Sequence, residues 1–203
     1  RLKDFTDQLT TLLTPEGILF SVNDSNEQNF TGLYQKAYYL YKEPLYKQIG
    51  DLAALPETLL VTEKEDTFEL GKTSLLLPAA GFGILRNKTA QAVLKFGGHG
   101  GYHGHYDRLS LASFIKDDMS FHNNEYAWFG YDSFLFKMWV QTSIAHNMTV
   151  GDGRMQKPSP CQCIYYEDTD TFQAVCAQTV TEWFDPPYGG QTPYPYTFPE
   201  EKC

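Results

Sequence analysis

The residues with the clearest chemical potential lie in a glycine-rich stretch at residues 97–107. It holds three of the five histidines, His99, His103 and His105, and it ends at Asp107. Because five glycines surround these histidines, the backbone can come close to a ligand and adopt a positive φ where a turn requires it. Imidazole exchanges protons near neutral pH and binds metals. The stretch could therefore serve acid–base catalysis, metal binding or both.

The spacing His103-Gly104-His105 leaves two arrangements open. On an extended backbone both rings would project from one face, where they could share a metal ion or divide between a metal and a substrate. Gly104 lets the chain leave the extended form, and histidines in such loops are often only hydrogen-bonded. Zinc accepts imidazole and carboxylate ligands, whereas no dense run of oxygen ligands favours calcium. Further candidate ligands follow in the sequence: Asp107, His122, Asn123 and His146.

Short strands are expected to position these residues. An apolar run at residues 90–96 precedes the stretch and an alternating run at 109–116 follows it, so the stretch should connect two strands. Residues 143–150 are also predicted to form a strand, which would carry His146. Other predicted strands cover residues 59–62, 73–77, 81–86, 119–122, 162–166 and 171–181. Many short strands at regular spacing favour an antiparallel β-sandwich.

The first part of the chain has the periodicity of helices instead. Three helices are predicted, over residues 2–13, 27–42 and 45–55. The polar break at residues 23–26 is expected to cap the second helix, and Asn23 and Asp24 to begin a loop that could line a cleft. Pro44 should close that helix. Helices thus precede strands, with a domain boundary near residue 57.

Composition narrows the class of protein. The chain has 203 residues, a formal charge of −9 and 42% hydrophobic residues, so it can bury a sizeable core. The acidity argues against a nucleic-acid partner, and an acidic substrate would need a local basic patch. No apolar run approaches the ~20 residues of a membrane span, and we expect no membrane partner. The chain begins at Arg1 in what looks like mid-fold sequence, which indicates a fragment or a processed chain.

Two segments resemble the heparinase II/III family of polysaccharide lyases, to which alginate lyases and dermatan sulfate epimerases are related. Residues 103–110 match the family's loop His-Gly-His-x-Asp-x-Leu-Ser, and residues 145–149 are similar to its Ala-His-Asn-Thr strand. The resemblance is specific over about residues 80–156. It implies an α+β fold, in which residues 1–56 are the C-terminal helices of an incomplete (α/α) toroid. Residues 57–203 would then form an antiparallel β-sandwich domain with an irregular Pro-rich tail.

The resemblance also implies roles for individual residues. His103 matches the family's catalytic histidine, and His105 and His146 match zinc ligands. The third ligand in the family is the Asp of an Asp-Pro-Gly sequence, and here Asn123 stands at that position. Asparagine is a neutral, poor zinc ligand. Either zinc is weak or absent, or His122 substitutes after a one-residue shift, which would turn its side chain to the opposite face.

The reaction implied by this resemblance is β-elimination at a uronic acid. A base must remove the weakly acidic C5 proton while the O4 substituent leaves, so the base must lie within hydrogen-bond reach. A tyrosine commonly completes the pair in these lyases, and Tyr131 is the first candidate, with Tyr126 second. Packing of either ring is the alternative. Candidate contacts to substrate carboxylate or sulfate groups are Arg86, Arg108 and Lys137, with a solvated charge as the alternative for each. Asn23 is a further candidate substrate contact, through the loop that could line the cleft.

The leading hypothesis is therefore a secreted or periplasmic polysaccharide lyase that acts on an acidic, uronic-acid-containing glycan. A C5-epimerase of the same chemistry and a non-catalytic carbohydrate-binding protein are the alternatives. The missing toroid would belong to a longer chain or to a second chain. A glycosidase would need two carboxylates flanking the bond, and only Asp107 stands beside the histidines. A serine hydrolase would need a Gly-x-Ser-x-Gly elbow, which the sequence lacks.

Overall fold

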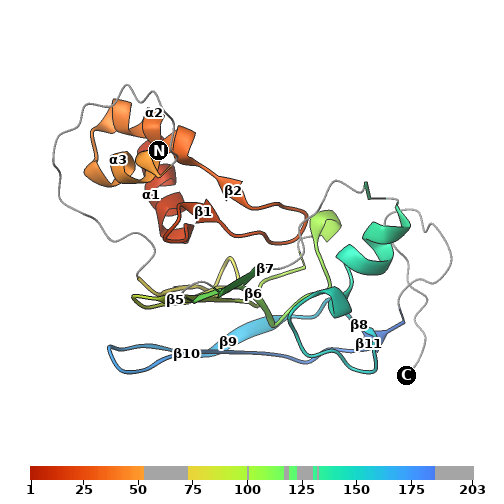
Figure 1. The fold of residues 1–203 in the computed structure, drawn as a ribbon. Coiled ribbons are helices and arrows are strands. Elements are labelled where there is room, and N and C mark those ends of the chain that lie inside the picture. Colours follow the sequence, from red (N-terminus) through yellow and green to blue (C-terminus); the bar gives the residue numbers. More distant parts are fainter. Residues whose placement is uncertain (53–72, 100, 117–118, 123–129, 132, 186–203) are drawn as a thin grey trace. The chain divides into compact units, whose positions relative to one another are not determined.

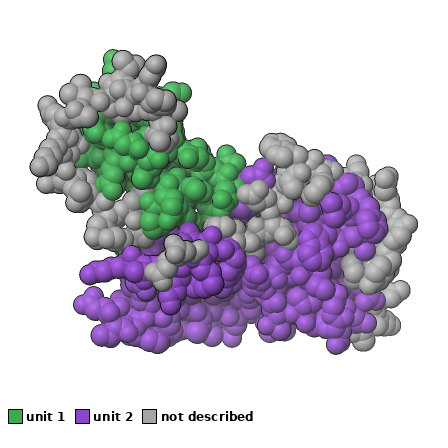
Figure 2. All heavy atoms as spheres, viewed as in Figure 1, with its two compact units in different colours: residues 1–20, 27–73 green, residues 21–26, 74–203 purple. Residues whose placement is uncertain are grey.

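The computed structural model describes residues 1–52, 73–99, 101–116, 119–122, 130–131 and 133–185 (Figure 1). The chain divides into two compact units, residues 1–20 with 27–73 and residues 21–26 with 74–203 (Figure 2). The loop 21–26 therefore belongs with the second unit, although its neighbours in sequence belong to the first. The predicted boundary near residue 57 and the predicted strand at 59–62 lie outside the described residues.

The first unit consists of helices and one short strand pair. Its elements are α1 (Leu2–Leu12), β1 (Ile18–Leu19), β2 (Gln28–Asn29), α2 (Thr31–Tyr41) and α3 (Pro44–Asp51). Their apolar faces meet in a core of Leu9, Leu13, Tyr34, Ala37, Tyr46 and Ile49. No described helix is both long and apolar enough to span a bilayer. The three predicted helices are thus present, with shifted ends.

Two local expectations about the second helix were wrong. Its N-cap is Phe30, and no side chain caps it, because the polar residues 23–26 form the loop that follows β1. The helix ends at Tyr41, and its C-cap residue Lys42 adopts a left-handed φ of 57°. Pro44 does not close α2 but occupies the first turn of α3. Proline is suited to that position, since the first turn of a helix leaves its N–H groups unbonded.

The second unit is built on a five-stranded antiparallel sheet in the order β3-β4-β5-β6-β7. Its strands are β3 (Leu75–Leu77), β4 (Phe82–Arg86), β5 (Ala90–Lys95), β6 (Ser110–Lys116) and β7 (Met119–His122). Each strand pairs with the next along the chain, so short turns suffice to connect most of them. The sequence prediction of these strands is confirmed. The long connection from β5 to β6 is the glycine-rich stretch.

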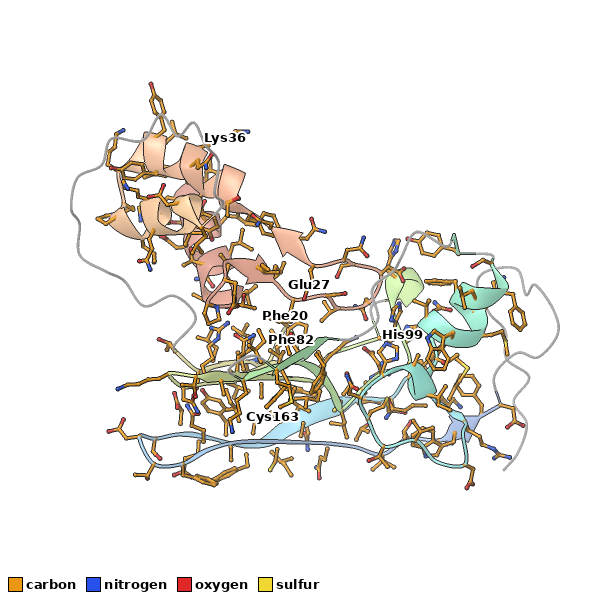
Figure 3. All side chains as sticks on the ribbon, viewed as in Figure 1. Phe20, Glu27, Lys36, Phe82, His99 and Cys163 are labelled. Carbon is orange, nitrogen blue, oxygen red and sulfur yellow. The ribbon has the colours of Figure 1, made fainter. Side chains whose placement is uncertain are left out.

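A second strand pair packs on this sheet. β9 (Cys161–Asp168) and β10 (Gln173–Thr179) form an antiparallel hairpin, and side chains fill the space between it and the sheet (Figure 3). Gln173 Nε2 donates to Ser74 Oγ at 2.8 Å and to the Arg86 carbonyl at 2.6 Å. Beside the hairpin, β8 (Met155–Gln156) pairs with β11 (Trp183–Phe184).

The predicted strand at residues 143–150 is wrong. A π-helix, η2 (Phe136–Val140), and a 3₁₀ helix, η3 (Ser143–Ala145), precede turns in this region. Ser143 Oγ donates to the Tyr106 carbonyl at 2.5 Å and accepts from the Gln156 backbone N–H at 2.8 Å. Such side-chain bonds to the backbone compete with a strand ladder. They hold the segment in turns that carry His146 inward.

Candidate active site

The turn between His103 and His105 separates the two rings. Residues Gly101–His103 form a 3₁₀ turn, and a Cβ on Gly104 would lie 1.5 Å from the His99 carbonyl oxygen. Only glycine fits this close approach of two backbone segments. The His103 side chain is consequently 69% exposed and that of His105 only 1%. The arrangement with both rings on one extended face is not formed.

The structure brings the two predicted catalytic residues together. The Tyr131 hydroxyl lies 3.0 Å from His103 Nδ1, and the two rings meet edge to face at 5.6 Å. The Tyr131 ring also packs at 5.3 Å against Phe136, which anchors it on η2. Asp24 Oδ2 lies 3.0 Å from the same His103 nitrogen. An exposed imidazole therefore stands between a phenol and a carboxylate.

Behind His103, the buried rings of His105 and His146 face each other. His105 Nδ1 and His146 Nε2 are 3.1 Å apart. His146 Nδ1 donates to the Thr142 carbonyl at 2.7 Å, and His105 Nε2 donates to Asp24 Oδ1 at 2.9 Å, because a carbonyl and a carboxylate can only accept. In neutral rings the two facing nitrogens then both carry lone pairs, which repel unless a cation lies between them.

Four buried charges lie close to this pair. The carboxylates of Asp24 and Asp107 and the ammonium of Lys95 are all buried, with side-chain exposures of 3%, 1% and 4%. The buried guanidinium of Arg108 interacts electrostatically with Asp107, so the four charges balance. Burial lowers the pKa of His146 to about 4 against the opposing pull of Asp107, so this ring is neutral at neutral pH.

The histidine pair could supply two metal ligands. Its hydrogen bonds match those of metal-bound histidines, which donate their other N–H to a carboxylate or a carbonyl. Within the described residues, no three His, Cys, Asp or Glu side chains converge as a metal site. Asp107 Oδ2 lies 3.8 Å from His146 Nε2, but both of its oxygens accept from Lys95 Nζ, at 2.6 and 2.7 Å. Asn123, the predicted third ligand, lies outside the described residues, as does Tyr126; of His122, only the backbone in β7 is described.

Asn23 supports the loop that carries this site. Its side-chain oxygen accepts from Lys95 Nζ at 2.5 Å and from the backbone N–H of His105 at 3.4 Å. Its own backbone takes a left-handed φ of 53°, a conformation that asparagine tolerates better than most residues. The amide oxygen of this predicted substrate contact is therefore engaged in holding the loop against β5.

The buried ion pair between Lys95 and Asp107 should matter for stability. We expect Lys95→Met to lower the free energy of unfolding by about 3–5 kcal/mol, because it leaves the Asp107 carboxylate buried without its partner. Urea unfolding measures this change. Lys157→Met, which breaks the exposed pair with Glu182, is the control and should cost only about 0–1 kcal/mol. Equal losses in the two variants would contradict the assignment.

The basic residues predicted to contact substrate are buried instead. Arg86 and Arg108 are each 3% exposed, and Lys137 is 2% exposed. Arg86 Nε donates to Gln91 Oε1 at 2.7 Å, and burial lowers its pKa to about 10. The Arg108 backbone is held by the Gln156 side chain at both its N–H and its carbonyl. Burial of both guanidinium groups does not support Arg86 and Arg108 as substrate contacts, and that role stays a prediction.

Two residues of this site were not linked to the histidines from sequence, although Asp24 was expected to lie in a loop that could line a cleft. Asp24 lies 79 positions before His103, and Lys95 ends a strand whose other residues are mostly apolar. Neither has a local pattern that reveals its partner. The sequence does offer one signal for Lys95. It ends an apolar strand at a position that alternation assigns to the buried face, and lysine is almost never fully buried unless it is paired.

Comparison with solved structures identifies the fold. No family model and no curated protein matches the sequence. A heparan sulfate lyase, HepC from Pedobacter heparinus, superposes with a TM-score of 0.69 at 14% identity, over 89% of this chain and 28% of that one. The heparinase III product of BT4657 gives 0.66 at 13% identity, over 87% and 27%. The chain thus has a heparinase-like fold and spans little more than a quarter of the length of these structures.

Proposed function

We propose that the protein is a polysaccharide lyase that cleaves uronic-acid-containing glycans by β-elimination. The observation that carries this proposal is the contact of 3.0 Å between the Tyr131 hydroxyl and Nδ1 of the exposed His103. A base and a proton donor side by side are what the reaction requires. The heparinase-like fold supports the same class of substrate, since one of the similar structures is described as a heparan sulfate lyase.

In the proposed reaction, His103 Nε2 takes the proton from C5 of the uronate. The C–H electrons form a C4=C5 double bond, and the C4–O4 bond breaks. Tyr131 gives its hydroxyl proton to the departing oxygen, so the products are an unsaturated uronate and a sugar hydroxyl. The proton on His103 Nε2 then leaves to solvent, and the Tyr131 oxygen takes a proton back from solvent. Both groups thus return to their starting states, with the proton on His103 Nδ1 retained throughout.

We further propose that zinc binds between His105 and His146. Bound zinc would act as a structural cation that fixes the two rings behind His103. The support is the pair of facing ring nitrogens at 3.1 Å, whose other N–H groups are held by Asp24 and by the Thr142 carbonyl. The identity of a third ligand stays open, with Asn123 as the candidate from the sequence.

Removal of this metal should be measurable without any substrate. We expect the purified protein to contain about one zinc per chain by elemental analysis, and a chelator to lower its Tm, because metal that binds only the folded state stabilises it. His146→Ala should lose the zinc. His103→Ala is the matched control and should keep it, since this exposed ring lies outside the pair. A stable, zinc-free wild-type protein would refute the proposal.

The partner and location follow from the proposed substrate. We propose an acidic polysaccharide as the partner. We also propose a secreted or periplasmic location, because the enzyme would encounter such glycans there. The remaining toroid would come from a longer chain or from a second chain. Neither nucleic acid nor a membrane is part of this proposal.

The experiment is a panel of acidic glycans, including heparan sulfate, chondroitin sulfate, hyaluronan and alginate, incubated in D₂O with the longest available form of the protein. A lyase produces the ultraviolet absorbance of the C4=C5 bond. An epimerase gives no such absorbance but incorporates deuterium at C5. Binding with neither signal would identify a carbohydrate-binding protein and overturn the proposal.

A further inference from the structure

Asp24 occupies a position that no other described acidic residue shares, because it contacts two of the three histidines in the glycine-rich stretch, His103 and His105. Its Oδ2 lies 3.0 Å from His103 Nδ1, its Oδ1 lies 2.9 Å from His105 Nε2, and its side chain is only 3% exposed. One carboxylate thus joins the exposed imidazole to the buried pair.

The loop 21–26 is folded so as to present this carboxylate. Ser21 Oγ donates to the Ser25 carbonyl at 2.5 Å, and the Val22 backbone N–H donates to Ser25 Oγ at 2.9 Å. Asn23, directly before Asp24, accepts from Lys95 Nζ at 2.5 Å. The position of Asp24 is therefore fixed by bonds on both sides of it.

The chemistry of a carboxylate determines where the ring protons lie. An ionised carboxylate only accepts hydrogen bonds, so His103 must carry its proton on Nδ1 and His105 must carry its proton on Nε2. The two rings thus take opposite tautomers. This leaves a lone pair on His103 Nε2, on the exposed ring, and a lone pair on His105 Nδ1, which faces His146.

The same bond affects Tyr131. When His103 Nδ1–H donates to Asp24, that nitrogen cannot also accept the tyrosine proton, although the oxygen lies 3.0 Å away. The hydroxyl proton of Tyr131 can then go to another acceptor. In the proposed elimination that acceptor is the departing sugar oxygen.

We propose that Asp24 is a positioning residue that sets the tautomers of His103 and His105 at once, and so couples the reacting histidine to the buried histidine pair. The role in turnover rests on the proposed lyase function. The tautomers themselves do not, because they are a property of the folded protein without substrate.

The variant Asp24→Asn tests this role with almost no change in side-chain volume. A carboxamide donates at one end and accepts at the other, so it cannot accept from both rings, and at least one ring must change its tautomer or lose its bond. In serine proteases, a wrong tautomer at the catalytic histidine lowers kcat by about 10⁴-fold. We expect kcat of Asp24→Asn to fall by about 10²–10⁴-fold, with KM changed far less.

The direct measurement is ¹⁵N–¹H NMR of histidine-labelled protein without substrate. In the wild type we expect a protonated Nδ1 on His103 and a protonated Nε2 on His105, and in Asp24→Asn an altered pattern for at least one ring. Asp170→Asn, an exposed aspartate in the turn between β9 and β10, should leave both patterns unchanged.

The outcomes separate the two proposals. Wild-type protein with the proton of His103 on Nε2 would overturn the role of Asp24, whether or not the protein cleaves a glycan. That spectrum needs no variant, so a failure of Asp24→Asn to fold does not obscure it. The expected tautomers in a protein that cleaves none of the glycans would instead retain the role of Asp24 in ordering the loop and count against the lyase.

Discussion

Replacement of His103 by alanine is expected to lower kcat/KM by about 10²–10⁴-fold, the usual contribution of a positioned acid–base group. The protein should remain folded, because this side chain is 69% exposed and its loss opens no cavity. Initial rates on the cleaved glycan measure the first effect, and circular dichroism with urea unfolding measures the second. The separation of activity from stability identifies a chemical role for the ring.

Tyr131→Phe removes only the hydroxyl of the partner and should reduce the rate by a similar factor. Tyr39→Phe is the matched control, since it deletes the hydroxyl of an exposed tyrosine on α2 and should leave the rate unchanged. Unaltered activity in Tyr131→Phe would exclude this residue as the proton donor. Tyr126, the second candidate from sequence, would then be the next residue to test.

Gly104→Ala should have the largest effect on folding among the substitutions in the loop. The added Cβ would lie 1.5 Å from the His99 carbonyl oxygen, and because the obstacle is backbone, no rotation of a side chain relieves it. We expect a loss at or above the upper end of the ~1–3 kcal/mol that overpacking usually costs. The separation of His103 from His105 should be lost with it. Urea unfolding and the zinc content of the soluble fraction test both effects.

Gly98→Ala is the control for this substitution. It lies in the same glycine-rich stretch, and a Cβ placed there would meet nothing within 4 Å. It should therefore change the free energy of unfolding very little. If both variants proved equally stable, the close approach of Gly104 to His99 would not exist in the protein.

The sheet was predictable from sequence because its signals are local. Each strand from β4 to β7 pairs with its neighbour in the chain, and a short polar turn joins β4 to β5, while the glycine-rich stretch joins β5 to β6. The segment at 143–150 has the same kind of local pattern but does not form a strand. Its conformation depends on hydrogen bonds from Ser143 to Tyr106 and Gln156. Because Tyr106 lies far from this segment in the sequence, the local pattern of residues cannot predict these bonds.

The site was predictable only in part, for a related reason. The spacing of His103 and His105 and the family resemblance singled out the histidines. Tyr131, chosen from sequence as the partner of His103, does lie beside it, although its role stays a prediction. The partnership of Asp24 with both rings is set by the fold of a distant loop. The burial of Arg86 and Arg108 was not predictable, because a sequence shows charge but not whether a guanidinium faces solvent.

The measurement that tests the account most directly is the ultraviolet absorbance of unsaturated uronate, followed in parallel for the wild type, His103→Ala and Tyr131→Phe on the glycan panel. The account predicts a rise on at least one glycan with the wild type and a strong loss in both variants. A wild-type rate retained in folded His103→Ala would contradict it, because the C5 proton would then be removed by another group.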